Sequence, residues 1–329
     1  MEGAAVVTRV ISFRQALNEA LREEMRRDSS VYLIGEDIGT YHSGRGPSGV
    51  TEGLLAEFGD QRVIETPICE GAIAGSSIGA AMFGMRPVVE IMHSEFLVTC
   101  FQYLVYGGAK ITALSNGRVK APLVIRTPFG CKEPGQAFQD ESNEAWFCHT
   151  PGLKVVMPST PYDAKGLLTA AIRDDHPVLF LEHKALYDVV GEVPKEQYSV
   201  PLGVADVKRS GRDVTVIAMG KIVSEALNAA ETLAERGIDV EVVDLRTLAP
   251  LDFDTILQSV WKTGRAVIFH EARKTGGLGG EVAALIAEAA FGDLRAPILR
   301  VGAPDVPSAL PPGSDDLVAA IEAISEIIA

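Results

Sequence analysis

The chain alternates short apolar runs with longer helix-like stretches, and this alternation constrains its fold more than any other feature. Between residues 31 and 183 the apolar runs are, in order, VYLIGED, RVIETPI, RPVVEIM, APLVIRTP, GLKVVMPST and PVLFLEH. Runs of this length separated by helices are typical of a largely parallel sheet that carries helices on both faces. We therefore expect an α/β fold.

The alternation stops once and then resumes, which predicts two domains. Residues 186–203 contain two prolines and no sustained period, so we interpret them as a linker. The strand-like runs DVTVIAMG, IDVEVVDL and RAVIFHE follow, again separated by helical stretches. A chain of 329 residues is also long for a single core. We expect a first domain over 1–185 and a smaller α/β domain over 204–329.

Charge and hydropathy exclude several classes of protein. The net charge is −14, and residues 1–200 and 201–329 carry −7 each, which argues against a nucleic-acid or anionic-membrane partner. The uncharged run at 71–85 is shorter than the roughly 18 apolar residues that a membrane span needs. The four cysteines form no CxxC pair, and residues 1–25 lack the apolar core of a signal peptide. We expect a cytoplasmic protein with reduced thiols.

Glu70 precedes an unusually bare predicted helix. It is followed by fifteen uncharged residues, among them Gly71, Gly75 and Gly79, which fall on one face of a helix. Each interior glycine costs roughly 1 kcal/mol relative to alanine, so close packing should offset that cost. The glycines can serve the packing of two helices or of two subunits, and Glu70 can simply stabilise the helix dipole. From the local pattern alone, a structural and a functional role both stay open.

Five longer stretches identify the chain as a member of a known family. They are GED at 35–37, RVIETPICEGAIAGSSIGAAMFGMRPVVEIM at 62–92, APLVIRTPFG at 121–130, PGLKVVMPSTPYDAKGLLTAAIRDDHPVLFLEHKALY at 151–187 and VDLRTLAPLD at 243–252. Together they resemble the β subunit of the heterotetrameric E1 component of 2-oxoacid dehydrogenase complexes, and the resemblance runs nearly from end to end. It implies a transketolase-like pyrimidine-binding domain followed by a transketolase C-terminal-like domain.

The resemblance also implies roles for single residues. Glu70 matches the acid that hydrogen-bonds N1′ of the aminopyrimidine of thiamine diphosphate and thereby activates the thiazolium carbon. Phe96 matches the aromatic residue that packs on the pyrimidine, and Ile68 and Met92 match its neighbours; core packing is the alternative for all three. Glu36 matches an acid between the two active sites of the tetramer that is credited with proton transfer, or it only stabilises a turn.

The diphosphate half of such a site is absent from this chain. The family binds the diphosphate through Mg²⁺ held by a GDG motif, and no GDG occurs here. The resemblance therefore implies that an E1 α-like subunit supplies the Mg²⁺ site in an α2β2 heterotetramer, with a lipoyl E2 or a carrier protein as a further partner. It also implies a K⁺ ion bound by the carbonyl oxygens of five residues, namely Leu123, Ala171, Ile172, Asp174 and His176.

Three segments depart from the family pattern. The usual HSQSFEAWF is QDESNEAWF at 139–147, so Gln139 stands at the position of an active-site histidine. A glutamine amide forms hydrogen bonds but exchanges no proton near neutral pH. His93 stands where the family usually has no histidine, and it either supplies the missing imidazole or is a polar pocket residue without a role in proton transfer. The loop YHSGRGPSG at 41–49 departs as well.

Three functions are compatible with these observations. The first is an E1 β subunit that, with its partner, decarboxylates a 2-oxoacid such as pyruvate, or cleaves acetoin, and passes the acyl unit to lipoyl E2. The second is a split transketolase-like enzyme that moves a two-carbon ketol unit from a ketose phosphate to an aldehyde or carrier-protein acceptor; Gln139 and the 41–49 loop keep it open. The third is a non-catalytic interface subunit, against which the intact Glu70 and Phe96 argue.

Overall fold

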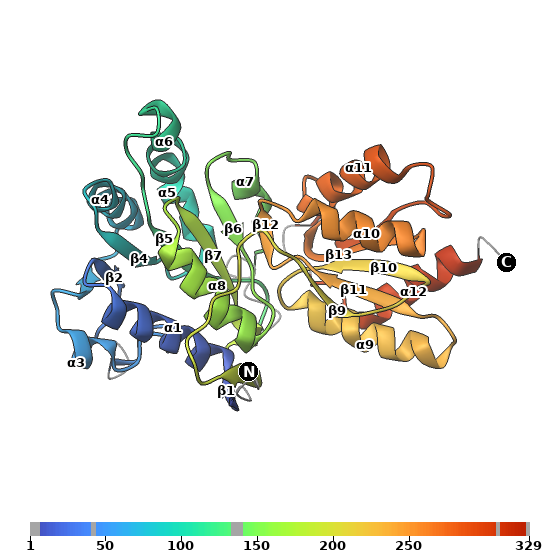
Figure 1. Ribbon diagram of the computed structural model, residues 1–329, viewed down its shortest axis with the longest axis horizontal. Helices are drawn as coiled ribbons and strands as arrows, with labels where there is room; N and C mark the ends of the chain where they lie inside the picture. Colours follow the sequence, from blue (N-terminus) through green and yellow to red (C-terminus); the bar gives the residue numbers. More distant parts are fainter. Residues whose placement is uncertain (1–6, 41–43, 133–140, 307–309, 327–329) are drawn as a thin grey trace, which may run out of the picture.

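Two sheets, each covered by helices, lie side by side along the long axis of the molecule (Figure 1). We describe them from a computed structural model of the chain, for residues 7–40, 44–132, 141–306 and 310–326. Most neighbouring strands in both sheets are parallel, so the expected α/β fold with largely parallel sheets is confirmed.

The first sheet has seven strands in the order β12-β6-β7-β5-β4-β2-β3. Their bounds are β2 Val31–Glu36, β3 Val63–Thr66, β4 Arg86–Glu90, β5 Val124–Phe129, β6 Lys154–Val156, β7 Val178–His183 and β12 Thr247–Ala249. Only β12 runs antiparallel to its neighbour, β6, and it comes from the second half of the chain. The second half therefore contributes an edge strand to the first sheet.

Helices cover both faces of the first sheet. One face carries α1 (Phe13–Arg27), α3 (Leu54–Phe58) and α8 (Pro161–Arg173). The other face carries α4 (Glu70–Met82), η1 (Ser94–Phe96), α5 (Leu97–Gln102), the π-helical η2 (Tyr103–Gly108), α6 (Ile111–Leu114) and α7 (Ala145–Cys148). Helix α1 begins with a capping box, in which Ser12 Oγ accepts from Gln15 N–H and Gln15 Oε1 accepts from Ser12 N–H.

A small separate sheet joins the N-terminus to the middle of the chain. Strand β1 (Thr8–Ser12) pairs antiparallel with β8 (Val190–Pro194). The strand β8 follows the short η3 (Lys184–Leu186) and lies inside 186–203, the segment that we interpret as a linker. This segment therefore joins the two large sheets along the chain, and its strand β8 is also paired with β1, the strand that leads into α1.

The second sheet has five strands in the order β14-β13-β10-β11-β9, of which only β9 is antiparallel to its neighbour. Its strands are β9 Asp206–Arg209, β10 Val214–Ala218, β11 Val240–Asp244, β13 Ala266–Arg273 and β14 Leu299–Ala303. One face packs against α9 (Ile222–Glu235) and α12 (Ser314–Glu326), and the other against α10 (Phe253–Thr263) and α11 (Leu278–Ala290).

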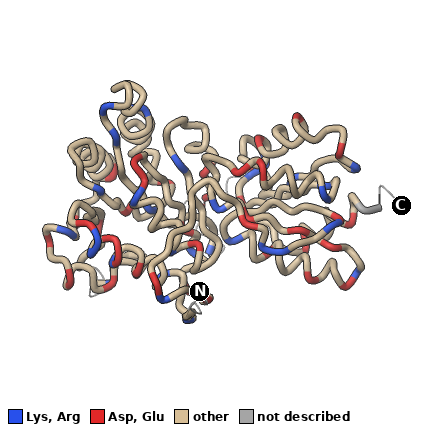
Figure 2. The backbone as a smooth tube through the Cα atoms, in the orientation of Figure 1, with Lys and Arg blue, Asp and Glu red and all other residues tan. Residues whose placement is uncertain are grey.

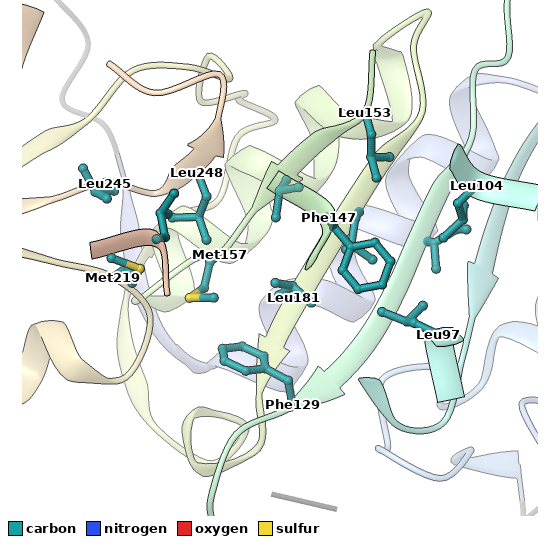
Figure 3. Close-up of a cluster of buried hydrophobic side chains, with 14 of the residues drawn as sticks. Leu97, Leu104, Phe129, Phe147, Leu153, Met157, Leu181, Met219, Leu245 and Leu248 are labelled. Atoms are coloured by element: carbon teal, nitrogen blue, oxygen red, sulfur yellow. The ribbon is translucent and has the colours of Figure 1, made fainter. Parts of the chain in front are cut away.

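One apolar core continues from the first sheet into the second. Figure 3 shows Phe129 and Met157 of the first half lying next to Met219, Leu245 and Leu248 of the second half. All five side chains are buried. Because this core crosses between the sheets, the two halves are packed against each other over apolar surface and not only joined by the chain.

Charged residues of both signs are spread over both halves of the molecule, as Figure 2 shows. Along the described backbone, Lys and Arg are interspersed with Asp and Glu. In the ranges described above, no helix has both the length and the apolar character needed to cross a membrane.

Candidate functional site

Glu70 is the first residue of α4 and follows β3 at the carboxyl end of the first sheet. Strand β2 is the parallel neighbour of β3 and ends at Glu36, which stands opposite Thr66 in the register. The carboxyl ends of parallel strands meet at one sheet edge, so Glu36 and Glu70 lie at the same edge. The pKa of Glu36 is raised by its partial burial and by the negative charges of Asp37 and Glu70. The two acids therefore interact electrostatically.

The glycines of α4 accommodate an aromatic ring. A Cβ atom at Gly71 would lie 3.2 Å from the ring of Tyr103, and one at Gly75 would lie 3.1 Å from it. Gly71 also faces the carbonyl oxygen of Thr99, at 3.4 Å from such a Cβ. The expected close helix packing is thus present at these two positions, whereas a Cβ at Gly79 would meet nothing within 4 Å.

The turn that follows β4 carries three of the predicted site residues. His93 precedes η1 and its ring meets the ring of Phe96 edge-on, with centroids 5.4 Å apart. Met92 and Phe96 are half-buried. The turn continues into α5, where Cys100 Sγ donates to the carbonyl oxygen of Glu70 at 3.3 Å. This contact links α5 to the start of α4.

Ile68 lies two residues before Glu70 and is 74% exposed. An isoleucine side chain of that exposure is not packed in the core of this chain, so the core-packing alternative does not apply to Ile68. Met85 at 37% and Phe83 at 93% exposure follow the other end of α4. Apolar side chains are therefore exposed at both ends of α4.

Gln139 lies outside the described residues, but the residues after it contact the turn at 92–96. The N–H of Glu141 donates to Glu95 Oε1 at 2.9 Å, and Asn143 Nδ2 donates to the carbonyl oxygen of Ser94 at 3.0 Å. The turn that carries His93 and residues 141–143 of the second altered segment are therefore hydrogen-bonded to each other. Glu95 and Glu141 are not among the residues predicted from the sequence; the only signal for them is that both stand beside departures from the family pattern.

His183 of the first half and Glu271 of the second half join the two halves of the molecule. His183 Nε2 lies 2.6 Å from Glu271 Oε2, and Glu271 Oε1 accepts from the N–H of Cys131 at 2.7 Å. Burial raises the pKa of Glu271, but the neighbouring His183 and the N–H of Cys131 outweigh it and hold the pKa below its usual value. Strand β13, which carries Glu271, thus contacts the chain at the end of β5.

Arg86 lies against the carbonyl groups predicted to bind K⁺. Its Nη1 donates to the carbonyl oxygens of Ile172 at 3.0 Å and Asp174 at 2.9 Å, and its Nη2 pairs with Asp175 at 2.7 Å. The carbonyl oxygens of Leu123 and Ala171 accept backbone N–H groups. A carbonyl oxygen has two lone pairs, so these bonds leave acceptor capacity for a cation, but the guanidinium places a positive charge beside it.

No cluster of three or more His, Cys, Asp or Glu side chains suitable for a metal ion occurs among the residues described above. The arrangement around Glu70 offers an acid, an aromatic residue and apolar side chains, which suit a pyrimidine ring and not a phosphate group.

The two halves of the chain match two domain families. Residues 9–190 match the pyrimidine-binding domain of transketolase, and residues 203–321 match the transketolase C-terminal domain. A solved chain described as a split-gene transketolase, in an inactive β4 tetramer, shares the fold with a TM-score of 0.78, 22% sequence identity and coverage of 97% of this chain and 99% of that one. The fold and the site therefore define a transketolase-type protein.

Relatives at higher identity narrow this class. The β subunit of 2-oxoisovalerate dehydrogenase from Bacillus subtilis is 48% identical over 300 residues, 91% of either chain. From the same organism, the acetoin:2,6-dichlorophenolindophenol oxidoreductase subunit β is 44% identical (94% of this chain, 93% of the relative), and the pyruvate dehydrogenase E1 subunit β is 47% identical (88% and 89%). The chain belongs to the family of β subunits of thiamine-diphosphate-dependent E1 components, and the resemblance found in the sequence is confirmed.

Proposed function

We propose that this chain forms an α2β2 heterotetramer with an E1 α-like subunit, and that the tetramer decarboxylates a 2-oxoacid or cleaves acetoin. The acyl unit then passes to a lipoyl E2. The observation that carries the proposal is the position of Glu70, which begins α4 at the carboxyl end of the sheet beside Glu36 and the 92–96 turn. The identities of 44–48% to three β subunits of this kind support it.

The residues of this chain fit the pyrimidine half of thiamine diphosphate. Glu70 would hold a proton at pyrimidine N1′, since it is a partly exposed carboxyl group at a helix start. Phe96 and Met92 would pack on the ring from the turn after β4, and the exposed Ile68 would cover its edge. When bound, the cofactor supplies the nucleophilic carbon that cleaves the substrate.

We assign proton exchange between the two sites of the tetramer to Glu36. Its pKa is raised, which brings the exchange of its proton closer to neutral pH, and this is the property that a relay needs. Its neighbour in the register, Thr66, belongs to the strand that leads to Glu70. The charge of Glu70 therefore acts directly on the pKa of Glu36.

His93 is our candidate for the proton transfer that Gln139 cannot perform. Its ring lies on the turn whose next two residues, Ser94 and Glu95, contact Asn143 and Glu141. An imidazole on this turn therefore lies close to Glu141 and Asn143, which follow Gln139 in the sequence. With a pKa near 6.5 in the absence of perturbation, a histidine is suited to exchange protons near neutral pH.

For the metals, we propose Mg²⁺ at the diphosphate, held by the α-like subunit, and K⁺ at the carbonyl groups around Ile172 and Asp174, sharing them with Arg86. A carrier protein in place of E2 is the second candidate acceptor. It belongs with the split transketolase alternative, which Gln139 and the altered 41–49 loop keep open.

A donor screen on the copurified heterotetramer tests this function. With thiamine diphosphate, Mg²⁺ and an artificial electron acceptor, we expect loss of a 2-oxoacid or of acetoin. Consumption of a ketose phosphate with no 2-oxoacid or acetoin turnover would instead establish the ketol-transfer reaction. Absence of all turnover in a correctly assembled tetramer would support a non-catalytic subunit.

A further inference from the structure

Arg273, the last residue of β13, forms a two-point ion pair across the two halves of the chain. Its Nη1 donates to Glu141 Oε2 at 2.5 Å and its Nη2 donates to Glu141 Oε1 at 3.1 Å. Both side chains are about one quarter to one third exposed, at 31% and 26%. Paired guanidinium–carboxylate bonds of this kind fix the direction of both groups as well as their distance.

Glu141 passes this constraint to the turn at 92–96. Its own N–H donates to Glu95 Oε1 at 2.9 Å, and its carbonyl oxygen accepts from the N–H of Gly130 at 3.1 Å. Asn143, two residues on, donates from Nδ2 to the carbonyl oxygen of Ser94 at 3.0 Å. Three hydrogen bonds thus hold the residues after position 140 between the end of β5 and the turn.

Cys131, which follows the end of β5, is hydrogen-bonded to the strand that carries Arg273, β13. The N–H of Cys131 donates to Glu271 Oε1 at 2.7 Å, and Glu271 lies two residues before Arg273 on β13. Residues 131 and 141 are therefore both held by side chains from one strand of the C-terminal half. Neither Glu271 nor Arg273 lies on the elements that carry Glu70, His93 or Phe96.

We infer that Arg273, acting through Glu141, is a positioning residue for the cofactor site. It fixes Glu95, and with it the turn that carries His93 and Phe96. The C-terminal domain therefore contributes to the geometry of a site that lies on the other domain. This inference rests on the proposed function, because it assigns the turn to the thiamine pocket.

The test compares four variants in the heterotetramer: Arg273→Met, Glu141→Gln, their combination and Arg273→Lys. Arg236→Met is the matched control, because it breaks an Arg–Glu pair, to Glu322, within the C-terminal half and between exposed side chains. We expect Arg273→Met and Glu141→Gln each to lower kcat/KM on the order of tenfold, the scale of a charge-assisted hydrogen bond. Because the residues act as one pair, the combination should lose no more than either single variant, and Arg273→Lys should lose less than Arg273→Met.

Hydrogen–deuterium exchange of the peptide covering 91–100 gives a readout that needs no turnover. We expect faster exchange there in Arg273→Met and unchanged exchange in Arg236→Met. Unchanged exchange in Arg273→Met would overturn the inference, as would kinetics equal to those of the control. An inactive parent tetramer would count against the proposed function alone, since exchange at 91–100 would still decide whether Arg273 positions the turn.

Discussion

Glu36 is the last residue of β2 and Glu70 the first residue of α4, at the same edge of the first sheet, and the charge of Glu70 contributes to the raised pKa of Glu36. Burial is the larger cause. An acid whose pKa is raised in the folded state costs stability once the pH exceeds its unfolded pKa, and the cost is complete above its folded pKa. Below both values the cost vanishes, because both states carry the proton.

Glu36→Gln should therefore raise the melting temperature at pH 7 and have a smaller effect as the pH falls towards 4. The amide removes the buried charge and its repulsion by Asp37 and Glu70. Melting curves of both proteins over pH 4 to 8 measure the difference. A constant difference across this range would show that Glu36 has no raised pKa, and a destabilised variant at pH 7 would show that its carboxylate makes a favourable contact.

Glycine replacements within α4 provide a matched pair. Gly79→Ala should stabilise the isolated chain by about 0.5–1 kcal/mol, because alanine is the better helix former and a Cβ there has open space. Gly75→Ala gains the same propensity but places a Cβ 3.1 Å from the ring of Tyr103. Its free energy of unfolding should be lower than that of Gly79→Ala, as measured by urea denaturation. Equal values for the two variants would mean that Tyr103 moves aside without cost.

Arg126 is buried in the first sheet between two acids. Its Nε and Nη2 donate to Glu182 at 2.6 and 2.8 Å, and its Nη1 donates to Glu90 at 2.8 Å. Arg126→Met should lower the free energy of unfolding by roughly 3–5 kcal/mol, because it leaves buried carboxylates without their cation. Arg212→Met, at a side chain that is 82% exposed, should change it by less than about 0.5 kcal/mol. A cost below 1 kcal/mol for Arg126→Met would show that both acids simply take up protons.

Potassium should stabilise the parent chain slightly and Arg86→Met more strongly. The reason is that Arg86 donates to two of the carbonyl groups in the proposed ligand set, and its removal frees them for a cation. Melting temperatures in KCl and in choline chloride at equal ionic strength measure this difference. If K⁺ has no effect on either protein, the carbonyl groups bind no metal ion, and the guanidinium of Arg86 is their only cationic partner among the described residues.

The largely parallel character of the first sheet could be predicted from the sequence, because each apolar run was long enough to be a buried parallel strand. Two pairings could not be predicted in this way. Strand β12 has three residues and β8 lies among prolines and glycines, so their pairing with β6 and β1 depends on tertiary contacts. Neither segment has a period that would distinguish it from a loop.

The candidate site shows the same division. Glu70 and Glu36 could be named because they stand within stretches that resemble a family, and Phe96 because it follows one of those stretches by four residues. Glu95, Glu141 and Arg273 could not be connected, because the bonds between them join residues 46 and 132 positions apart. Glu95 and Glu141 meet through the packing of the first domain, and Arg273 reaches Glu141 through the packing of the two domains. Close packing of α4 could be predicted from its glycines, but the ring of Tyr103 that packs against Gly71 and Gly75 could not.

Glu70→Gln in the heterotetramer tests the central claim most directly. The amide keeps the size of the side chain and cannot hold or release the proton at pyrimidine N1′. The measurement is kcat for the best donor, with thiamine diphosphate binding followed by calorimetry on the same samples. We predict that the variant assembles and loses at least 100-fold in kcat, the usual scale for removal of a general acid or base. A Glu70→Gln tetramer with the activity of the parent would contradict the assignment of this acid to the cofactor.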